Sequence, residues 1–309
     1  MHALTQPLLA IFAALGPIFF MIALGYVFRR QRFPGEAFWP GAEKLTYFLL
    51  FPALLVHNLA LAELGEYAIA PLAAVIVTAL AIMSLLLFLL RPILRVDGPA
   101  FSSIYQGSIR FNTYVGLAAA GALFHLPGST VAALVIAILI PLVNVLCVGV
   151  LSHANGSTGL VELLRSLIGN PLILACLLGI LLNISGLGLP IGTESVLDIL
   201  ARAALPLGLL TVGAGLRLHV AFTRYRVLLS TAVLKLWLLP ALTFLTLAAD
   251  LEELETVILV LFAALPGAPS AYILARQLGG DAELMAAIVT VETGLSIITL
   301  PVILLWLVS

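Results

Sequence analysis

The chain has 309 residues, of which 62% are hydrophobic and 9% charged, and its formal net charge is −1 at pH 7. Soluble domains carry about 25% charged residues, so this composition argues against a soluble protein and predicts one that crosses a membrane several times. The balanced charge gives no sign of a nucleic-acid partner. The sequence contains no G-x-S-x-G, H-E-x-x-H or P-loop motif, so no enzyme activity, catalytic residue or metal site is expected.

Ten apolar segments are each long enough to span a bilayer as a helix, which takes about 20 residues. Lipid leaves free backbone groups without hydrogen-bond partners, so each segment is expected to be helical. The first segment has neither the basic flank nor the cleavage site of a secretory signal, and is expected to be retained. Residues 152–167 are expected to form a short cytoplasmic linker. The segments run over 7–28, 41–61, 68–90, 101–123, 129–151, 168–187, 196–216, 226–248, 256–275 and 284–307.

The basic residues fall on alternate connections between the segments, or just inside the neighbouring segments. The opposite connections carry acidic residues and no Lys or Arg. Positively charged connections stay in the cytoplasm, so the sequence predicts a protein of the inner (plasma) membrane with both termini outside. The basic residues are Arg29, Arg30, Arg32, Lys44, Arg91, Arg95, Arg165, Arg217, Arg224, Arg226 and Arg276. The opposing acidic residues are Glu63, Glu66, Glu194, Asp250, Glu252, Glu253 and Glu255.

The two halves of the chain share features at a fixed offset. A shift of 154 residues places Pro17 on Pro171, near the starts of segments 1 and 6. The same shift places Asn112 on Pro266, in the middle of segments 4 and 9. Each half holds an odd number of segments, so the second half is inverted relative to the first, as in many secondary transporters. The expected units are a first repeat over 1–151 and a second over 168–309.

Segment 9 contains Pro266, Gly267 and Pro269 near its middle. Proline removes a backbone donor and clashes with the preceding turn, so the helix is expected either to break there or to be kinked. Segment 4 has Asn112 at the matching place, where its side chain could bond freed backbone groups. Two breaks that meet would point helix N-termini, with their partial positive charge, at an anionic ligand.

Ionisable side chains inside the segments mark candidate functional sites. Arg110 lies about ten residues into segment 4, roughly 15 Å deep, and either binds an anion or forms a permanent ion pair that locks the helices. Lys235 and Glu292 either pair with each other or exchange protons during transport. Asn144 lies near the place of Glu292 in the repeat and is either a coupling residue or a helix-packing hydrogen bonder. The two cations and one anion leave a surplus positive charge that a bound anion could neutralise.

Four stretches carry a family resemblance. They are SIRFNTYVGLA at 108–118, GNPLILACLLGILLN at 169–183, LPLGLLTVGAGLRL at 205–218 and ALPGAPSAYILARQLGGDAELMAAIVTVETGLSIITLP at 264–301. Together they resemble the auxin efflux carrier family, in its bacterial, malate/malonate permease-like branch.

The resemblance implies an all-α polytopic membrane protein with ten transmembrane helices in two inverted five-helix repeats, similar to bile-acid symporters and cation–proton antiporters. Helices 1, 2, 6 and 7 would form a scaffold that dimerises, and helices 3–5 and 8–10 a transport domain in which broken helices 4 and 9 cross. Asn112 and Thr113 match the family's Asn-Thr pair, and Pro266 matches its crossing proline. Segment 4 lacks the family's proline, so its break would rest on Asn112 and Gly116.

The sequence therefore predicts a secondary transporter that moves a small organic carboxylate anion by alternating access. The alternatives are a sodium- or proton-coupled cation exchanger of the same fold and a non-transporting membrane ligand sensor. The expected partners are the anion, membrane lipid and a second copy of the chain, with no cofactor beyond H⁺ or Na⁺ as coupling ions. The expected substrate-binding residues are Arg110, Asn112, Thr113, Gly116, Pro266, Gly267, Pro269 and Ser270, and the charge-balancing or coupling residues are Lys235, Glu292 and Asn144.

Overall fold

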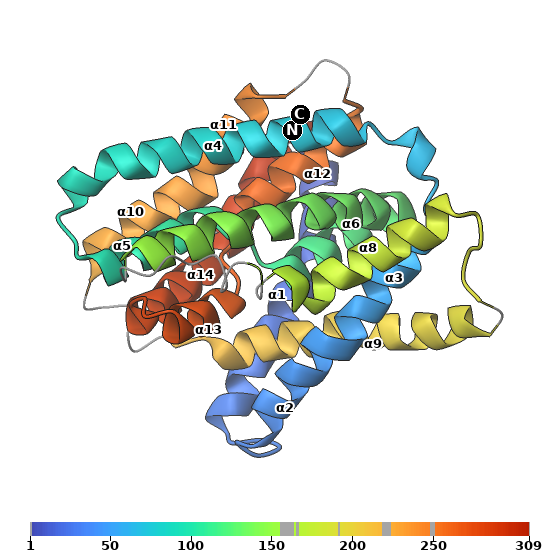
Figure 1. Cartoon of the computed structure of the whole chain (residues 1–309), viewed down its shortest axis with the longest axis horizontal. Coiled ribbons are helices and arrows are strands. Elements are labelled where there is room, and N and C mark those ends of the chain that lie inside the picture. The colour runs from blue at the N-terminus through green and yellow to red at the C-terminus, as the bar shows by residue number, and fades with distance from the viewer. Residues whose placement is uncertain are drawn as a thin grey trace.

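The computed structural model describes residues 2–154, 164, 167–190, 192–217, 224–247 and 251–308, and within these residues helices are the only regular secondary structure. Figure 1 shows long helices packed side by side in one body. The helices are α1 (His2–Arg30), α2 (Phe38–Leu45), α3 (Phe51–Ala60), α4 (Ile69–Leu94), α5 (Gly98–Ile109), α6 (Thr113–Ala154), α8 (Pro171–Ile184), α9 (Thr193–Gly215), α10 (Tyr225–Val233), α11 (Leu239–Leu245), α12 (Glu253–Ala264), α13 (Ser270–Gln277) and α14 (Ala282–Val308).

The described chain is that of a polytopic membrane protein. Six of its helical stretches are long and apolar enough to cross a membrane, and the helix Pro171–Ile184 is apolar but shorter. Many large apolar side chains face outward from these helices, as a lipid environment requires. The six stretches are Leu9–Arg30, Ile69–Leu94, Gly98–Leu151, Thr193–Gly215, Tyr225–Leu245 and Ala282–Leu307.

Three helical stretches depart from regular geometry, two of them next to a proline. The π-helical turns Thr46–Leu50 and Leu234–Leu238 each come just before a proline, Pro52 or Pro240. A proline ring clashes with the carbonyl four residues earlier, and a wider π-helical turn relieves that clash. Helix α6 consists of two helices joined at the non-helical His125 (φ 54°, ψ −139°). That joint separates the predicted segments 101–123 and 129–151.

Two groups of helices can be distinguished by their packing. Helices α1 and α9 approach backbone to backbone, since a β-carbon on Gly213 would overlap the carbonyl of Ile22. Helices α3 and α8 pack closely beside them. In Figure 1, α3 and α8 lie at the right and α9 runs across the lower part, whereas α4 crosses the top and α5 and α10 lie at the left. The candidate site lies where the two groups meet. The predicted linker falls mostly outside the described residues, as does Arg165.

Candidate functional site

Two helices are interrupted inside the protein, and the interruptions touch. The first separates α5 from α6 and comprises residues 110–112, which are not helical. The second separates α12 from α13 and comprises residues 265–269. The backbone N–H of Asn112 donates to the carbonyl oxygen of Pro266 at 2.8 Å, which joins the two breaks directly. The predicted break at Pro266 is thus confirmed, and the alternative of a simple kink is wrong.

Asn112 caps the second half of the interrupted helix. Its side-chain Oδ1 accepts from the backbone N–H of Tyr114 at 3.1 Å and of Val115 at 3.3 Å. Asparagine is among the best N-cap residues because it satisfies amides that have no partner in the first turn. The expectation that Asn112 bonds freed backbone groups is confirmed.

Gly116 has a different role from the predicted one. It lies within α6 rather than in the break, and a β-carbon there would come within 2.6 Å of Leu265 Cδ1 and 2.9 Å of Phe262 Cζ. The absent side chain lets α6 approach the end of α12. The break therefore does not rest on Gly116.

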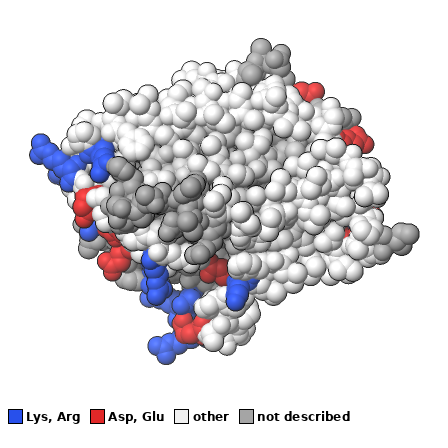
Figure 2. Space-filling view, in the orientation of Figure 1, with Lys and Arg blue, Asp and Glu red and all other residues white. Residues whose placement is uncertain are grey.

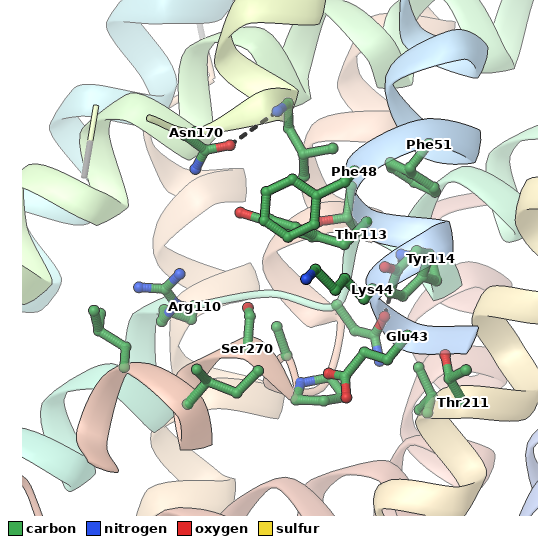
Figure 3. Close-up of a pocket in the computed structure, with 18 of the residues that line it drawn as sticks. Glu43, Lys44, Phe48, Phe51, Arg110, Thr113, Tyr114, Asn170, Thr211 and Ser270 are labelled. Atoms are coloured by element: carbon green, nitrogen blue, oxygen red, sulfur yellow. Dashed lines mark hydrogen bonds between the residues drawn. The ribbon is translucent and has the colours of Figure 1, made fainter. Parts of the chain in front are cut away.

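A cavity of about 470 Å³ lies against the two breaks. Figure 3 shows Lys44, Arg110, Thr113 and Ser270 around this space. The predicted residues Arg110, Asn112, Thr113, Asn144, Pro269 and Ser270 line it, whereas Gly116, Pro266 and Gly267 are absent from its lining. The other polar residues in its lining, which the sequence reasoning did not assign to a site, are Glu43, Lys44, Tyr47, Asn170, Tyr114, Thr211 and Gln277.

Arg110 enters the cavity with unused hydrogen-bonding capacity. Its Nη2 donates to Asn144 Oδ1 at 3.1 Å, and its buried Nη1 has no hydrogen-bond partner among the described residues. No carboxylate of the described chain lies within 4.0 Å of its guanidinium. The predicted alternative of a locking ion pair thus finds no partner in the described residues. A guanidinium with free donors suits a carboxylate, which it can bind through two parallel hydrogen bonds.

The rest of the cavity wall also favours an anion. Lys44 and Arg110 together supply two positive charges against the one negative charge of Glu43, so the lining has a surplus of one positive charge. Lys44 lies in the last turn of α2, and the sequence identifies it only as one of the basic residues near the segment ends. No periodic pattern or motif in the sequence distinguishes Lys44 from the other basic residues near helix ends.

Three helices also begin at the cavity. Thr113, Ser270 and the Asn170–Pro171 pair stand at the N-termini of α6, α13 and α8. The Asn170 side chain caps α8 by accepting from the backbone N–H of Leu172 at 2.9 Å. Helix N-termini carry partial positive charge and bind anions. The Asn170–Pro171 pair is a cap followed by a proline in the first turn, and this pattern could have pointed to a helix start at the site.

Lys235 and Glu292 do not line the cavity and are fully buried, each with 0% of its surface exposed. Lys235 Nζ donates to the carbonyl oxygen of Ala263 at 2.9 Å, and Glu292 Oε2 accepts from the backbone N–H of Gly267 at 2.8 Å. Among the residues that the structure describes, Lys235 and Glu292 form no ion pair with each other, because no nitrogen–oxygen distance between them is 4.0 Å or less. The expected direct pairing of Lys235 with Glu292 is therefore not observed. No group of three metal-ligating side chains lies together in the part of the chain that the structure describes.

Comparison with known proteins finds one family match, over the second half of the chain. Residues 158–304 match the family model described as membrane transport protein. The match includes Asn170, Lys235, the α12–α13 break and Glu292. It agrees with the resemblance to the auxin efflux carrier family for the three stretches after residue 168, whereas the stretch at 108–118 lies outside the match. No curated protein matches the chain.

Proposed function

We propose that this member of the membrane transport protein family is a secondary transporter that moves small carboxylate anions by alternating access. The observation that carries the proposal is the cavity at the two touching breaks, where Arg110 Nη1 has no protein partner and three helices begin. The buried guanidinium and the helix N-termini provide the positive charge that a carboxylate needs in a largely apolar interior.

The proposed architecture is ten membrane crossings in two inverted repeats. The positions of the breaks support it. At the shift of 154 residues, Ile109, the end of α5, falls on Ala263, one residue before α12 ends. Inverted repeats whose broken helices meet at a midplane site are a recurring design of secondary transporters. The scaffold would comprise α1, α2–α3, α8 and α9, which the resemblance also assigns to dimer contacts.

The charge distribution supports an orientation with the cavity facing the cytoplasm. In Figure 2, the visible Lys and Arg side chains gather at the left and lower part of the molecule, and only acidic side chains are coloured at the opposite upper right. Lys44 and Gln277 bring the cavity lining to helix ends that carry basic residues. Basic helix ends face the cytoplasm, so both termini would be outside and the substrate would enter this state from the cytoplasm of a bacterial-type inner membrane.

In the proposed cycle, a carboxylate binds Arg110 while the hydroxyls of Thr113 and Ser270 and the amides at the helix starts offer further donors. The helices that carry the two breaks then move against the scaffold to expose the site on the other side. A membrane potential that is negative inside favours export by about 2.3 kcal/mol per negative charge per 100 mV. Uptake would need H⁺ or Na⁺ as a coupling ion.

Counterflow in liposomes tests the proposal. Purified protein is reconstituted into vesicles loaded with unlabelled malate, and entry of labelled malate is measured, followed by other mono- and dicarboxylates. We expect time-dependent accumulation that is lost in Arg110→Ala. Arg202→Ala is the matched control because Arg202 is an exposed arginine paired with Asp198 at 2.7 Å. The absence of flux for every small carboxylate would refute the proposal, and a response to a pH or sodium jump without organic substrate would indicate a cation exchanger.

A further inference from the structure

Two buried side chains of opposite charge stand on either side of the α12–α13 break, and neither bonds to the other. Lys235 comes from the π-helical turn between α10 and α11, and Glu292 from α14. Burying an ionised group is costly unless it is paired or hydrogen-bonded. The partners that these two groups find are backbone atoms exposed by the break.

Lys235 binds the negative end of α12. Its Nζ donates at 2.9 Å to the carbonyl oxygen of Ala263, one residue before the helix ends at Ala264. The last carbonyls of a helix have no partner within the helix and carry partial negative charge. A cation that donates to one of them stabilises the helix end in an interior that has no water to do so.

Glu292 binds the other side of the same break. Its Oε2 accepts at 2.8 Å from the N–H of Gly267, which no longer belongs to a helix. A β-carbon on Gly267 would lie 2.9 Å from that same oxygen, so a larger residue at this position would displace the carboxylate from its contact. The Pro-Gly sequence of the break is therefore matched to an acidic residue on a neighbouring helix.

These contacts have a direct consequence at the crossing. Pro266, which lies between Ala263 and Gly267, presents its carbonyl oxygen to the N–H of Asn112 at 2.8 Å. Fixing the chain on both sides of Pro266 fixes the position of that carbonyl. It also fixes the start of α13, where Pro269 and Ser270 line the cavity.

We propose that Lys235 and Glu292 are positioning residues that act as a pair of opposite charges to hold the α12–α13 break open. They do not touch the cavity, and the geometry assigns them neither substrate binding nor proton transfer. The link to transport rests on the function proposed above, since the break they fix carries one wall of the substrate cavity. Their effect on the backbone of the break is independent of that function.

Hydrogen–deuterium exchange of detergent-solubilised protein tests the proposal directly. Two variants change the charge and the length of the side chain separately. Glu292→Gln keeps the length, and Glu292→Asp keeps the negative charge that balances Lys235. Both weaken the bond to Gly267, because charge-assisted hydrogen bonds are about twice as strong as neutral ones and aspartate is one methylene shorter. We expect amides in peptides spanning residues 265–270 to exchange about five- to tenfold faster than in the wild type, as local opening becomes easier.

Glu255→Gln provides the matched control. Glu255 is also buried, with 2% of its surface exposed, and also accepts from backbone N–H groups, those of Ala68 and Glu252, but it lies at the far end of α12. It should leave exchange at residues 265–270 unchanged. Unchanged exchange there in both Glu292 variants would overturn the proposal, whatever their overall stability.

Transport gives a second readout. Malate counterflow in Glu292→Gln vesicles should show a raised KM and an unaltered pH profile. If the pH dependence of the wild type disappears in this variant, Glu292 carries a proton and the proposal is wrong. If the wild type transports no carboxylate, the proposed function fails, and the exchange experiment still decides whether Glu292 holds the break.

Discussion

Replacing Arg110 by glutamine should weaken anion binding strongly and change stability little. The guanidinium donates to Asn144 through Nη2, and its buried Nη1 has no partner in the described chain. A hydrogen bond to a charged group contributes about 1.5–3 kcal/mol. Since about 1.4 kcal/mol corresponds to a tenfold change in Kd, loss of one such bond to a bound carboxylate predicts a Kd for malate roughly 10- to 150-fold higher.

Isothermal titration of purified protein with malate measures the affinity, and thermal unfolding in the same detergent measures stability. Arg110→Lys keeps the charge but loses the two-pronged geometry, so its Kd should lie between those of the wild type and Arg110→Gln. Arg202→Gln removes an exposed arginine and should leave Kd unchanged.

The opposite pattern would refute this reasoning. If Arg110 locks the helices, Arg110→Gln unfolds at a clearly lower temperature and binds malate within twofold of the wild-type Kd. Removing one member of a buried ion pair costs about 3–5 kcal/mol, a loss that thermal unfolding would detect. The two roles therefore differ in which of the two measurements changes.

Three further substitutions test the site. Lys44→Gln removes one of the two cavity cations and should raise the Kd for malate severalfold, less than Arg110→Gln does, with a weaker dependence of Kd on salt; an unaltered Kd would remove Lys44 from the site. Asn112→Ala deletes the N-cap of α6 and should cost about 0.5–2 kcal/mol of stability, seen as a lower unfolding temperature. Gly116→Val should destabilise by about 1–3 kcal/mol through overpacking against Leu265. Gly149→Val, in the second part of α6 with no atom within 4 Å of its added β-carbon, should not. Equal effects of the two substitutions would contradict the close approach at Gly116.

The features that the sequence predicted well depend on local chemistry. The Pro-Gly-Ala-Pro run at 266–269 disrupts a helix wherever it occurs, and the structure breaks the helix there. The apolar segments became helices because lipid permits little else. Asn112 was expected to bond backbone groups because its side chain does so locally, and it caps α6.

The features that the sequence did not predict depend on which helices become neighbours. The break in segment 4 was expected to rest partly on Gly116, but this glycine instead leaves room for Phe262 and Leu265 at the end of α12. Lys44 resembled the other basic residues near helix ends, and only the packing of α2 beside the two breaks places it at the cavity. Neither contact can be predicted from the spacing of residues along the chain.

The structure places the charges differently from the grouping that the sequence indicated. The sequence indicated a surplus positive charge from Arg110, Lys235 and Glu292 taken together. In the structure, Lys235 and Glu292 bind backbone groups of opposite partial charge at one break, so their charges offset each other away from the cavity. The surplus at the cavity comes instead from Arg110 and Lys44 against Glu43. Neutralising Lys235 should therefore act on the geometry of the break, and neutralising Lys44 on the affinity for the anion.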